Sequence, residues 1–407
     1  MPDFGKALRG IERGLKPAAT DWKSALANYV IAGFNPRSIL PPGEIQSTRL
    51  GSHYVIRASY PHDHFHGKVR LNRLSSADLE SLINLMGEKT AAPHRNRIVF
   101  LDTETTGMQG GTGMCPFLVG LGYFEEDDFQ MVQFFIRDFD EEPSMLLALG
   151  ELLSRFELVI TYNGAAFDIP LLETRFTLAR LENPFAAMPH FDLLFTARKL
   201  WRNGHGSCRL AALERELVAF MRGPDIPGAM IPRAYFDYLQ RRPSVTLRSV
   251  FTHNVDDVVS LAALTVHACD RVNFEPAALD NPMDLYSLGR VFENCSDWRR
   301  SIRLYEMALS GGIDGPARQK VLENLVVLYR RSGEHERAMH ICSELMNSPD
   351  FSLVGYEGSA IYAERVARDY ESALSTLEKA LARAESPRVR KVLQARWDRL
   401  RQKIIRF

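Results

Sequence analysis

The sequence predicts an α/β domain with a mixed sheet, followed by an all-α domain of repeated helical hairpins. Apolar strands alternate with helices from Ile98 to about Val272, which is the pattern of an α/β domain. After Asp280 the pattern becomes wholly helical and repeats itself. A chain of 407 residues is also too long for one small core, so two or three domains are expected.

We expect residues 1–95 to form a partly β extension that packs on the α/β domain. His53 to Leu71 is predicted as one or two strands, and Ser76 to Lys89 as a helix that Ser76 caps. Three histidines would alternate along one strand face: His62, His64 and His66. A metal site there lacks a fourth ligand, so a polar strand face is the favoured interpretation.

We expect residues 96–272 to form the α/β domain. Its predicted strands are Ile98–Leu101, Leu118–Tyr123, Phe129–Ile136 and Leu158–Tyr162. Its predicted helices follow Pro143, end near Phe176 and Trp201, and span Leu210–Phe220 and Val250–Cys269. Two strands joined by a short hairpin, followed by alternating strand and helix, indicate a mixed sheet.

Residues 282–407 are predicted to form tetratricopeptide-like helical repeats. A pattern that starts at Asp297 recurs at Asp369, and a weaker middle copy starts at Gly333. The equivalent small residues are 37 and 35 positions apart, close to the 34-residue tetratricopeptide period: Ser301, Ala338 and Ala373. A plain bundle of three hairpins is the alternative. Such repeats make a protein partner possible.

The last segment, Arg388 to Phe407, has eight basic residues and one acidic residue. Its apolar residues fall on one helical stripe: Val389, Leu393, Trp397, Leu400 and Ile404. We therefore predict a helix that caps the repeats and exposes a basic face. Contact of that face with a phosphate backbone is the alternative.

Composition and charge exclude several classes of protein. The longest apolar run, Pro116 to Phe124, is too short to span a bilayer, and the first 30 residues lack a secretory pattern. The five cysteines form no CxxC pair and no zinc spacing, which favours reduced thiols. We therefore expect a cytoplasmic protein with no membrane partner.

The zero net charge conceals a segregation along the chain. Residues 1–98 hold 14 basic and 8 acidic residues, residues 99–281 hold 15 and 25, and residues 282–407 hold 21 and 17. The balanced total therefore does not exclude a nucleic-acid substrate, because the basic flanking segments can contact phosphates.

Catalytic chemistry is first indicated by Asp102 and Glu104, which end an apolar strand. Alternate residues of a strand share a face, so the two carboxylates lie side by side. At about 4 Å they repel by roughly 4 kcal/mol at an effective dielectric near 20, which favours a divalent cation between them. Two acids in a solvated turn are the alternative.

Two further acids and a histidine follow along the domain. Asp168 opens a helix after the turn at Asn163-Gly164, where it can also be a simple cap. His253 and Asp257 are four residues apart on a helix and share one face. A solvated surface pair is the alternative for these two residues.

This order of residues resembles the DEDD exonucleases of the ribonuclease H-like superfamily, and more narrowly the YprB-type ribonuclease H-like proteins. Three further stretches carry the resemblance, which covers residues 50 to 272: Leu118-Val119-Gly120-Leu121-Gly122, His190-Phe191-Asp192-Leu193-Leu194 before Ala197-Arg198-Lys199-Leu200-Trp201, and Asp225-Ile226-Pro227-Gly228 with Ile231-Pro232. Tetratricopeptide repeats after such a domain fit that family's variants.

The resemblance implies a 3′→5′ exonuclease that hydrolyses phosphodiester bonds of single-stranded DNA or RNA. Asp102, Glu104, Asp168 and Asp257 would hold two Mg²⁺ or Mn²⁺ ions, one activating water and one stabilising the leaving 3′ oxygen. Hard oxygen ligands suit those ions. His253 would be the general base, with an unperturbed pKa near 6.5.

One spacing departs from that family. Three residues separate His253 from Asp257, as in members where a tyrosine holds the place, whereas members with a histidine have four. This leaves another group open as the base, and Asp256 open as a substitute for Asp257.

Several lesser features keep two interpretations. His190 and Asp192 either support the site or start a helix. Three cations either contact phosphates or lie on a solvated helix face: Arg198, Lys199 and Arg202. The glycines from Gly107 to Gly113 indicate a hairpin turn, because no Lys-Ser/Thr follows as in a phosphate loop.

The alternative function is a non-catalytic scaffold that binds nucleic acid and recruits a protein through its repeats. The presence of all four acids favours an enzyme over that scaffold. A hydrolase or transferase that acts on another phosphoester is the third option.

Overall fold

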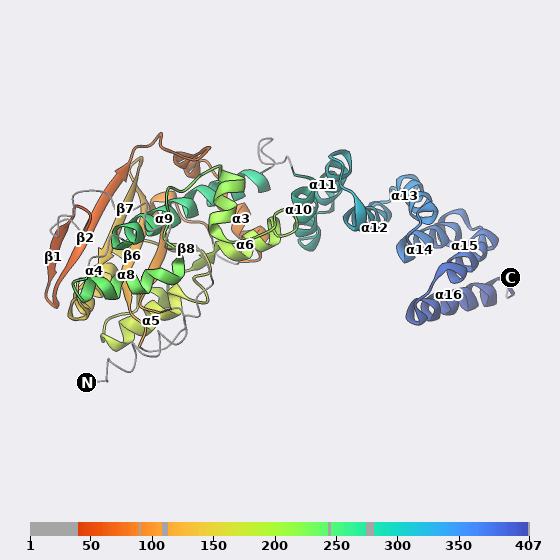
Figure 1. Ribbon diagram of the computed structural model, residues 1–407. Coiled ribbons are helices and arrows are strands. Elements are labelled where there is room, and N and C mark those ends of the chain that lie inside the picture. The colour runs from red at the N-terminus through yellow and green to blue at the C-terminus, as the bar shows by residue number, and fades with distance from the viewer. Residues whose placement is uncertain (1–39, 89–90, 108–112, 243–245, 274–280, 406–407) are drawn as a thin grey trace.

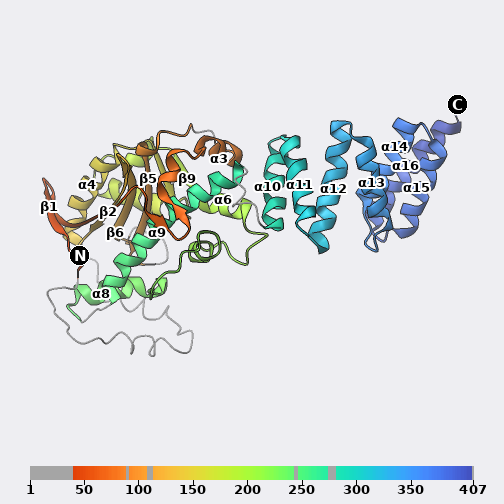
Figure 2. The same ribbon diagram turned by 90° about the horizontal axis from the view of Figure 1, so that it is seen from above.

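The computed structural model describes residues 40–88, 91–107, 113–242, 246–273 and 281–405. An α/β domain lies at one end, and a row of antiparallel helices extends away from it to the C-terminus (Figures 1 and 2). The predicted fold class is confirmed: a mixed sheet with helices is followed by a helical C-terminal region. No helix in the described ranges is long and apolar enough to cross a membrane.

A seven-stranded sheet in the order β1-β2-β7-β6-β5-β8-β9 forms the centre of the α/β domain. Its strands are β1 (Glu44–Thr48), β2 (Gly51–Tyr60), β5 (Ile98–Thr105), β6 (Pro116–Glu125), β7 (Asp128–Phe135), β8 (Leu158–Thr161) and β9 (His190–Asp192). Strand β5 pairs antiparallel with β6 and parallel with β8. The sheet therefore changes from antiparallel to parallel pairing at the strand that carries Asp102 and Glu104.

Helices bury both faces of this sheet. Ile98 and Phe100 of β5 belong to one apolar core, and Val99 and Leu101 belong to the other, as the alternation of a strand requires. The helices of the domain are α3 (Leu79–Met86), α4 (Glu142–Leu153), α5 (Asp168–Leu178), α6 (Leu193–Leu200), α7 (Leu210–Leu213), α8 (Ile231–Leu239) and α9 (Thr246–Val272). Because both faces of β5 are covered by apolar cores, the polar residues at the end of this strand lie next to the interior.

Two predicted elements differ in the structure. The predicted helix Leu210–Phe220 is α7 followed by a π-helical turn, η6 (Glu214–Val218), which ends at Ala219 with φ 57°. Residues 190–192 form a short strand, β9, parallel to β8, and Asp192 also starts α6 as predicted, because its side chain accepts from the Leu194 amide at 3.0 Å. A three-residue edge strand is too short for its alternation to be recognised.

The cap of α3 was also predicted wrongly. Asp78, and not Ser76, accepts a hydrogen bond from the Ser81 amide at 2.9 Å. An aspartate at this position satisfies an amide that the first helical turn leaves without a partner.

The three N-terminal histidines do not share a strand face. Only His66 lies in a strand, β3 (Phe65–His66), which pairs with β4 (Val69–Arg70). His66 is buried, bonds Ser260 Oγ at 2.7 Å and stacks on Phe220. Burial lowers its pKa to about 3, so His66 packs as a neutral ring.

The C-terminal region consists of α10 (Pro282–Asn294), α11 (Trp298–Ser310), α12 (Gly315–Ser332), α13 (His335–Asn347), α14 (Leu353–Tyr362), α15 (Tyr370–Arg383) and α16 (Pro387–Ile405). The small residues of the repeat pattern are buried: Ser301, Ala338 and Ala373. At Gly289 of α10, a Cβ would lie 2.6 Å from the Tyr305 ring of α11. Small residues therefore let paired helices approach closely.

The α/β domain and the first repeat share one core. Trp201 and Leu200 belong to the same cluster as Leu288 of α10. Beside this cluster, buried Asp284 pairs with Arg271 at 3.2 Å. The apolar core continues from residues 96–272 into residues 282–407. The division of the chain into these two domains therefore stays a prediction.

Candidate active site

A cavity of about 370 Å³ opens at the end of β5. Asp102 and Glu104 from β5, Asp168 from α5 and His253 from α9 all line it. The structure thus brings four of the five predicted site residues to one cavity, although they come from three separate segments. Asp257 does not line the cavity; it follows His253 by one turn of α9, with 3.5 Å between His253 Nε2 and Asp257 Oδ2, and its charge raises the pKa of Asp102 and Glu104.

Asp102 is oriented by Asn254, a buried residue for which the sequence predicts no role. Asn254 Nδ2 donates to Asp102 Oδ2 at 2.8 Å and to the Asp102 carbonyl at 3.2 Å. Gln133 of β7 in turn donates to Asn254 Oδ1 at 2.9 Å. Gly120 of β6 makes room for this, because a Cβ there would lie 2.2 Å from Asn254 Oδ1.

Asp168 is held at the start of α5 by neighbouring strands. The Thr103 amide and hydroxyl donate to Asp168 Oδ1 at 3.1 and 2.6 Å. The preceding turn is fixed by Asp192, which accepts from the Asn163 and Ala165 amides at 2.8 and 3.1 Å. Asp192 therefore shapes the turn that delivers Asp168, and does not line the cavity itself.

The three carboxyls on the β5 side are crowded and desolvated. Burial raises the pKa of Asp102, of Glu104 and of Asp168, the last to about 6. Repulsion from neighbouring acids raises the first two further. Glu104 Oε1 is buried with no hydrogen-bond partner among the described residues. Carboxylate oxygens are the type of donor that Mg²⁺ and Mn²⁺ prefer.

Asp257 differs, because it pairs with the guanidinium of Arg222. The Arg222 side chain is 9% exposed, and it also donates to the fully buried Glu214 at 2.5 and 2.7 Å. Within the described ranges, no group of three His, Cys, Asp or Glu side chains is arranged to hold a metal ion. Arg222 lies in the irregular segment between η6 and α8, so no helical or strand spacing links it to Asp257.

His253 is also bound to an acid that the sequence analysis left unassigned. Its Nδ1 lies 2.7 Å from Asp225 Oδ1. Burial lowers the His253 pKa, but the hydrogen bond to Asp225 and the charge of Asp257 outweigh burial, so the pKa is raised. The unperturbed value near 6.5 therefore does not apply to this arrangement. Of the two neighbouring acids, Asp257 is the one that contacts His253. Burial raises the pKa of the other, Asp256, to about 6.

The other cations and glycines considered lie at the edge of the site or away from it. Arg198 and Arg202 are exposed and do not line the cavity, and Lys199 Nζ donates to the Met86 carbonyl. Gly107 lines the cavity, whereas residues 108–112 of the connection between β5 and β6 lie outside the described residues.

Comparisons with known proteins match two regions of the chain to family models and find one relative along most of its length. Residues 99–269 match the RNase_H superfamily model, and residues 285–316 match the tetratricopeptide repeat model. The chain is 28% identical over 364 residues to the uncharacterized protein YprB of Bacillus subtilis (strain 168), with 86% of each chain covered. A family B DNA polymerase from Pyrobaculum calidifontis aligns with a TM-score of 0.33 and 13% identity over 51% of this chain. The alignment spans 30% of that polymerase chain.

Proposed function

We propose that this YprB homologue, with its RNase H superfamily domain, is a metal-dependent 3′→5′ exonuclease acting on single-stranded DNA or RNA. The observation that carries the proposal is the carboxyl cluster of Asp102, Glu104 and Asp168, in which Glu104 and Asp168 are buried and Glu104 Oε1 has no partner among the described residues. Buried like charges are unfavourable unless a cation compensates them. A divalent ion would meet this requirement and join the cluster to a phosphodiester.

The residues of the cluster have distinct roles in this proposal. Asp102, Glu104 and Asp168 would hold Mg²⁺ or Mn²⁺, with Asp257 joining them once Arg222 releases it. Bound ions would supply an activated water and stabilise the leaving 3′ oxygen. His253 accepts a proton only in its neutral form, so its raised pKa predicts weak base activity at neutral pH in the metal-free protein.

Aromatic side chains at the cavity support a single-stranded substrate. Phe167 is 50% exposed, and it lines the cavity together with Tyr162. Single-strand binding sites commonly stack bases on aromatic rings. An unpaired terminal nucleotide could therefore place its base on Phe167 and its phosphate at the carboxyl cluster.

The direct test uses the full chain with Mn²⁺ and 5′-labelled single strands of DNA and RNA. We expect a ladder of products shortened from the 3′ end, which EDTA abolishes and a blocked 3′ terminus prevents. The Asp102→Ala variant is the control for a contaminating nuclease. Internal cuts that ignore the 3′ block would contradict the exonuclease assignment.

The Arg222–Asp257 pair favours one alternative, a scaffold that binds nucleic acid without cleaving it. In that case Arg222 would replace a metal ion permanently. Calorimetric titration with Mn²⁺ separates the two functions: the enzyme takes up the ion and Asp102→Asn loses that uptake. A scaffold takes up none, and binds an oligonucleotide equally well in EDTA.

For either function we propose a cytoplasmic location, testable by cell fractionation, because all five cysteines are free thiols.

A further inference from the structure

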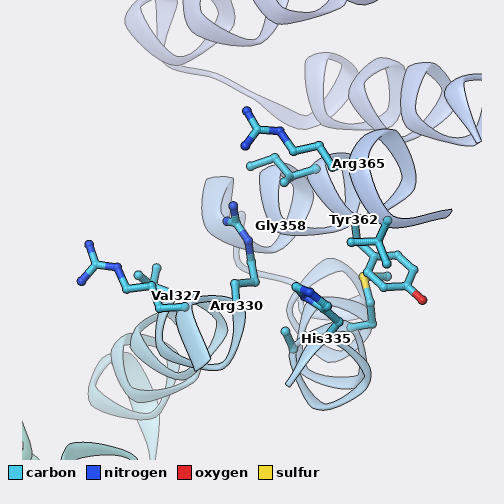
Figure 3. A pocket seen from close by; sticks show the side chains of 11 residues that line it. Val327, Arg330, His335, Gly358, Tyr362 and Arg365 are labelled. Carbon is cyan, nitrogen blue, oxygen red and sulfur yellow. The ribbon is translucent and has the colours of Figure 1, made fainter. Parts of the chain in front are cut away.

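A second cavity, of about 520 Å³, lies within the helical repeats. Its walls come from α12, from α13, and from α14 with the π-helical turn η9 (Ala363–Ala367) that follows it. Figure 3 shows Arg330 projecting from α12 and Arg365 from the segment after α14, with His335 and Tyr362 between the helices. No acidic side chain lines this cavity in the described part of the chain.

The interior of the groove is aliphatic. Ala338 and Met339 of α13 face Ile361 of α14, and Val366 of η9 lies at the rim. Val366 is 45% exposed, so no neighbouring helix of the described chain covers it. A ligand that brings a branched or linear aliphatic side chain would remove this apolar surface from water.

The rim is cationic. Arg331 lies over the Trp298 ring at 5.5 Å from its centroid. Neither Arg330 nor Arg365 forms an ion pair within the described ranges, whereas other arginines of the repeats do: Arg318 with Glu344, Arg337 with Glu306 and Arg396 with Glu357. Two guanidinium groups beside an aliphatic interior are therefore available to an anionic ligand.

We propose that this groove binds an acidic peptide segment of a partner protein. One or two aliphatic side chains of the peptide occupy the interior, and flanking Asp or Glu carboxylates pair with Arg330 and Arg365. Guanidinium groups bind carboxylates through paired, charge-assisted hydrogen bonds. The inference does not depend on nuclease activity.

A single-stranded nucleic acid fits the same groove less well. Sites for single strands combine basic residues with open aromatic faces on which successive bases stack. Here the rings of His335 and Tyr362 lie near each other, tilted by 58° with 6.3 Å between centroids. The remaining interior residues are aliphatic, which suits peptide side chains.

The test measures fluorescence anisotropy of a labelled ten-residue peptide, Leu-Ile flanked by Asp and Glu with both ends blocked, against the full chain. In the control peptide, Asn replaces each Asp and Gln replaces each Glu. We expect the acidic peptide to bind at least about tenfold more tightly, with an advantage that salt reduces. Equal binding of the two peptides would overturn the proposal.

Variants locate the binding. Val366→Asp places a negative charge at an exposed position and should weaken the acidic peptide at least about tenfold without changing the melting temperature. Arg330→Gln/Arg365→Gln should do the same, while the matched control Arg299→Gln/Arg388→Gln should not. Arg365→Glu should gain affinity for a peptide with Lys in place of its acids. The peptide proposal would be wrong if neither peptide binds and a single-stranded oligonucleotide binds instead, with an affinity that Val366→Asp lowers. The groove would then be a nucleic-acid site.

Discussion

Two regions of this protein place buried carboxyls in opposite environments. At the junction of domain and repeats, Asp284 is fully buried but lies 3.2 Å from Arg271 and 3.0 Å from His205. At the end of β5, Glu104 is buried and Asp102 is half-buried, mainly among other acids, which raise the pKa of both beyond the effect of burial. A carboxyl with a protein cation holds the fold together, whereas a cluster without one favours an external cation.

Asp257 lies between these two cases. It belongs to the predicted metal ligands, yet Arg222 provides it with a cation from the protein itself. The same guanidinium neutralises Glu214, which is fully buried. Arg222 therefore pairs at the same time with a buried acid of the interior and with a proposed metal ligand.

Replacing Asp102 by alanine should produce the largest change. Loss of one proposed metal ligand is expected to lower turnover roughly a thousandfold, with little loss of stability because the change removes one of several acids that repel each other. Turnover is measured on 5′-labelled single strands with Mn²⁺, and melting is followed by circular dichroism. Wild-type turnover in the variant would remove Asp102 from the site.

Replacing Asp284 by asparagine should act on stability instead. The change leaves Arg271, which is 1% exposed, without its carboxylate, at a cost of about 3–5 kcal/mol. Urea unfolding measures the loss, and turnover per folded molecule should stay at the wild-type level. A variant as stable as the wild type would mean that the two carboxyl environments are equivalent.

Asn254→Ala tests whether a neighbour of the cluster positions it. Asp102 loses its side-chain donor and Gln133 loses its acceptor, so we expect turnover or Mn²⁺ affinity to fall about 10–100-fold. Calorimetry with Mn²⁺ provides a readout apart from cleavage. The isosteric Asn254→Asp would place a further acid beside Asp102, and it should restore neither property.

The smallest effect concerns pH in the metal-free protein. The Asp168 pKa is raised from 3.8 to about 6, so the folded state holds a proton that the unfolded state has lost. The stability that this proton provides is complete below about pH 3.8 and disappears as pH rises through about 6. In EDTA, Asp168→Asn should therefore gain about 1–2 kcal/mol over the wild type between pH 5 and 7.5.

Mn²⁺ should reverse that order at pH 7.5. The ion stabilises the wild type by binding the folded state alone, whereas Asp168→Asn binds it weakly. Thermal melting of both proteins with and without Mn²⁺ measures this. A wild type that is more stable than the variant in EDTA at pH 7.5 would contradict the burial of an ionised Asp168.

Much of the site could be predicted because its residues follow regular elements. Asp102 and Glu104 continue an apolar strand, and His253 and Asp257 share a helix face. The strand period of two residues and the helix spacing of four residues therefore predict that the members of each pair lie side by side. The repeats were found for the same reason, through small residues at a constant spacing. The partners Arg222, Asp225 and Asn254 could not be found in this way, because their contacts depend on how distant segments pack.

The sequence by itself determined most of the strands and helices in their order, the recurrence of the helical hairpins and the acids that meet at β5. These properties follow from local periodicity and from burial of apolar residues. Only the tertiary structure decided which acids receive a cation from the protein. An ion pair forms where two chain segments meet in the interior, and the choice of Arg271 for Asp284 and of Arg222 for Asp257 rests on that packing.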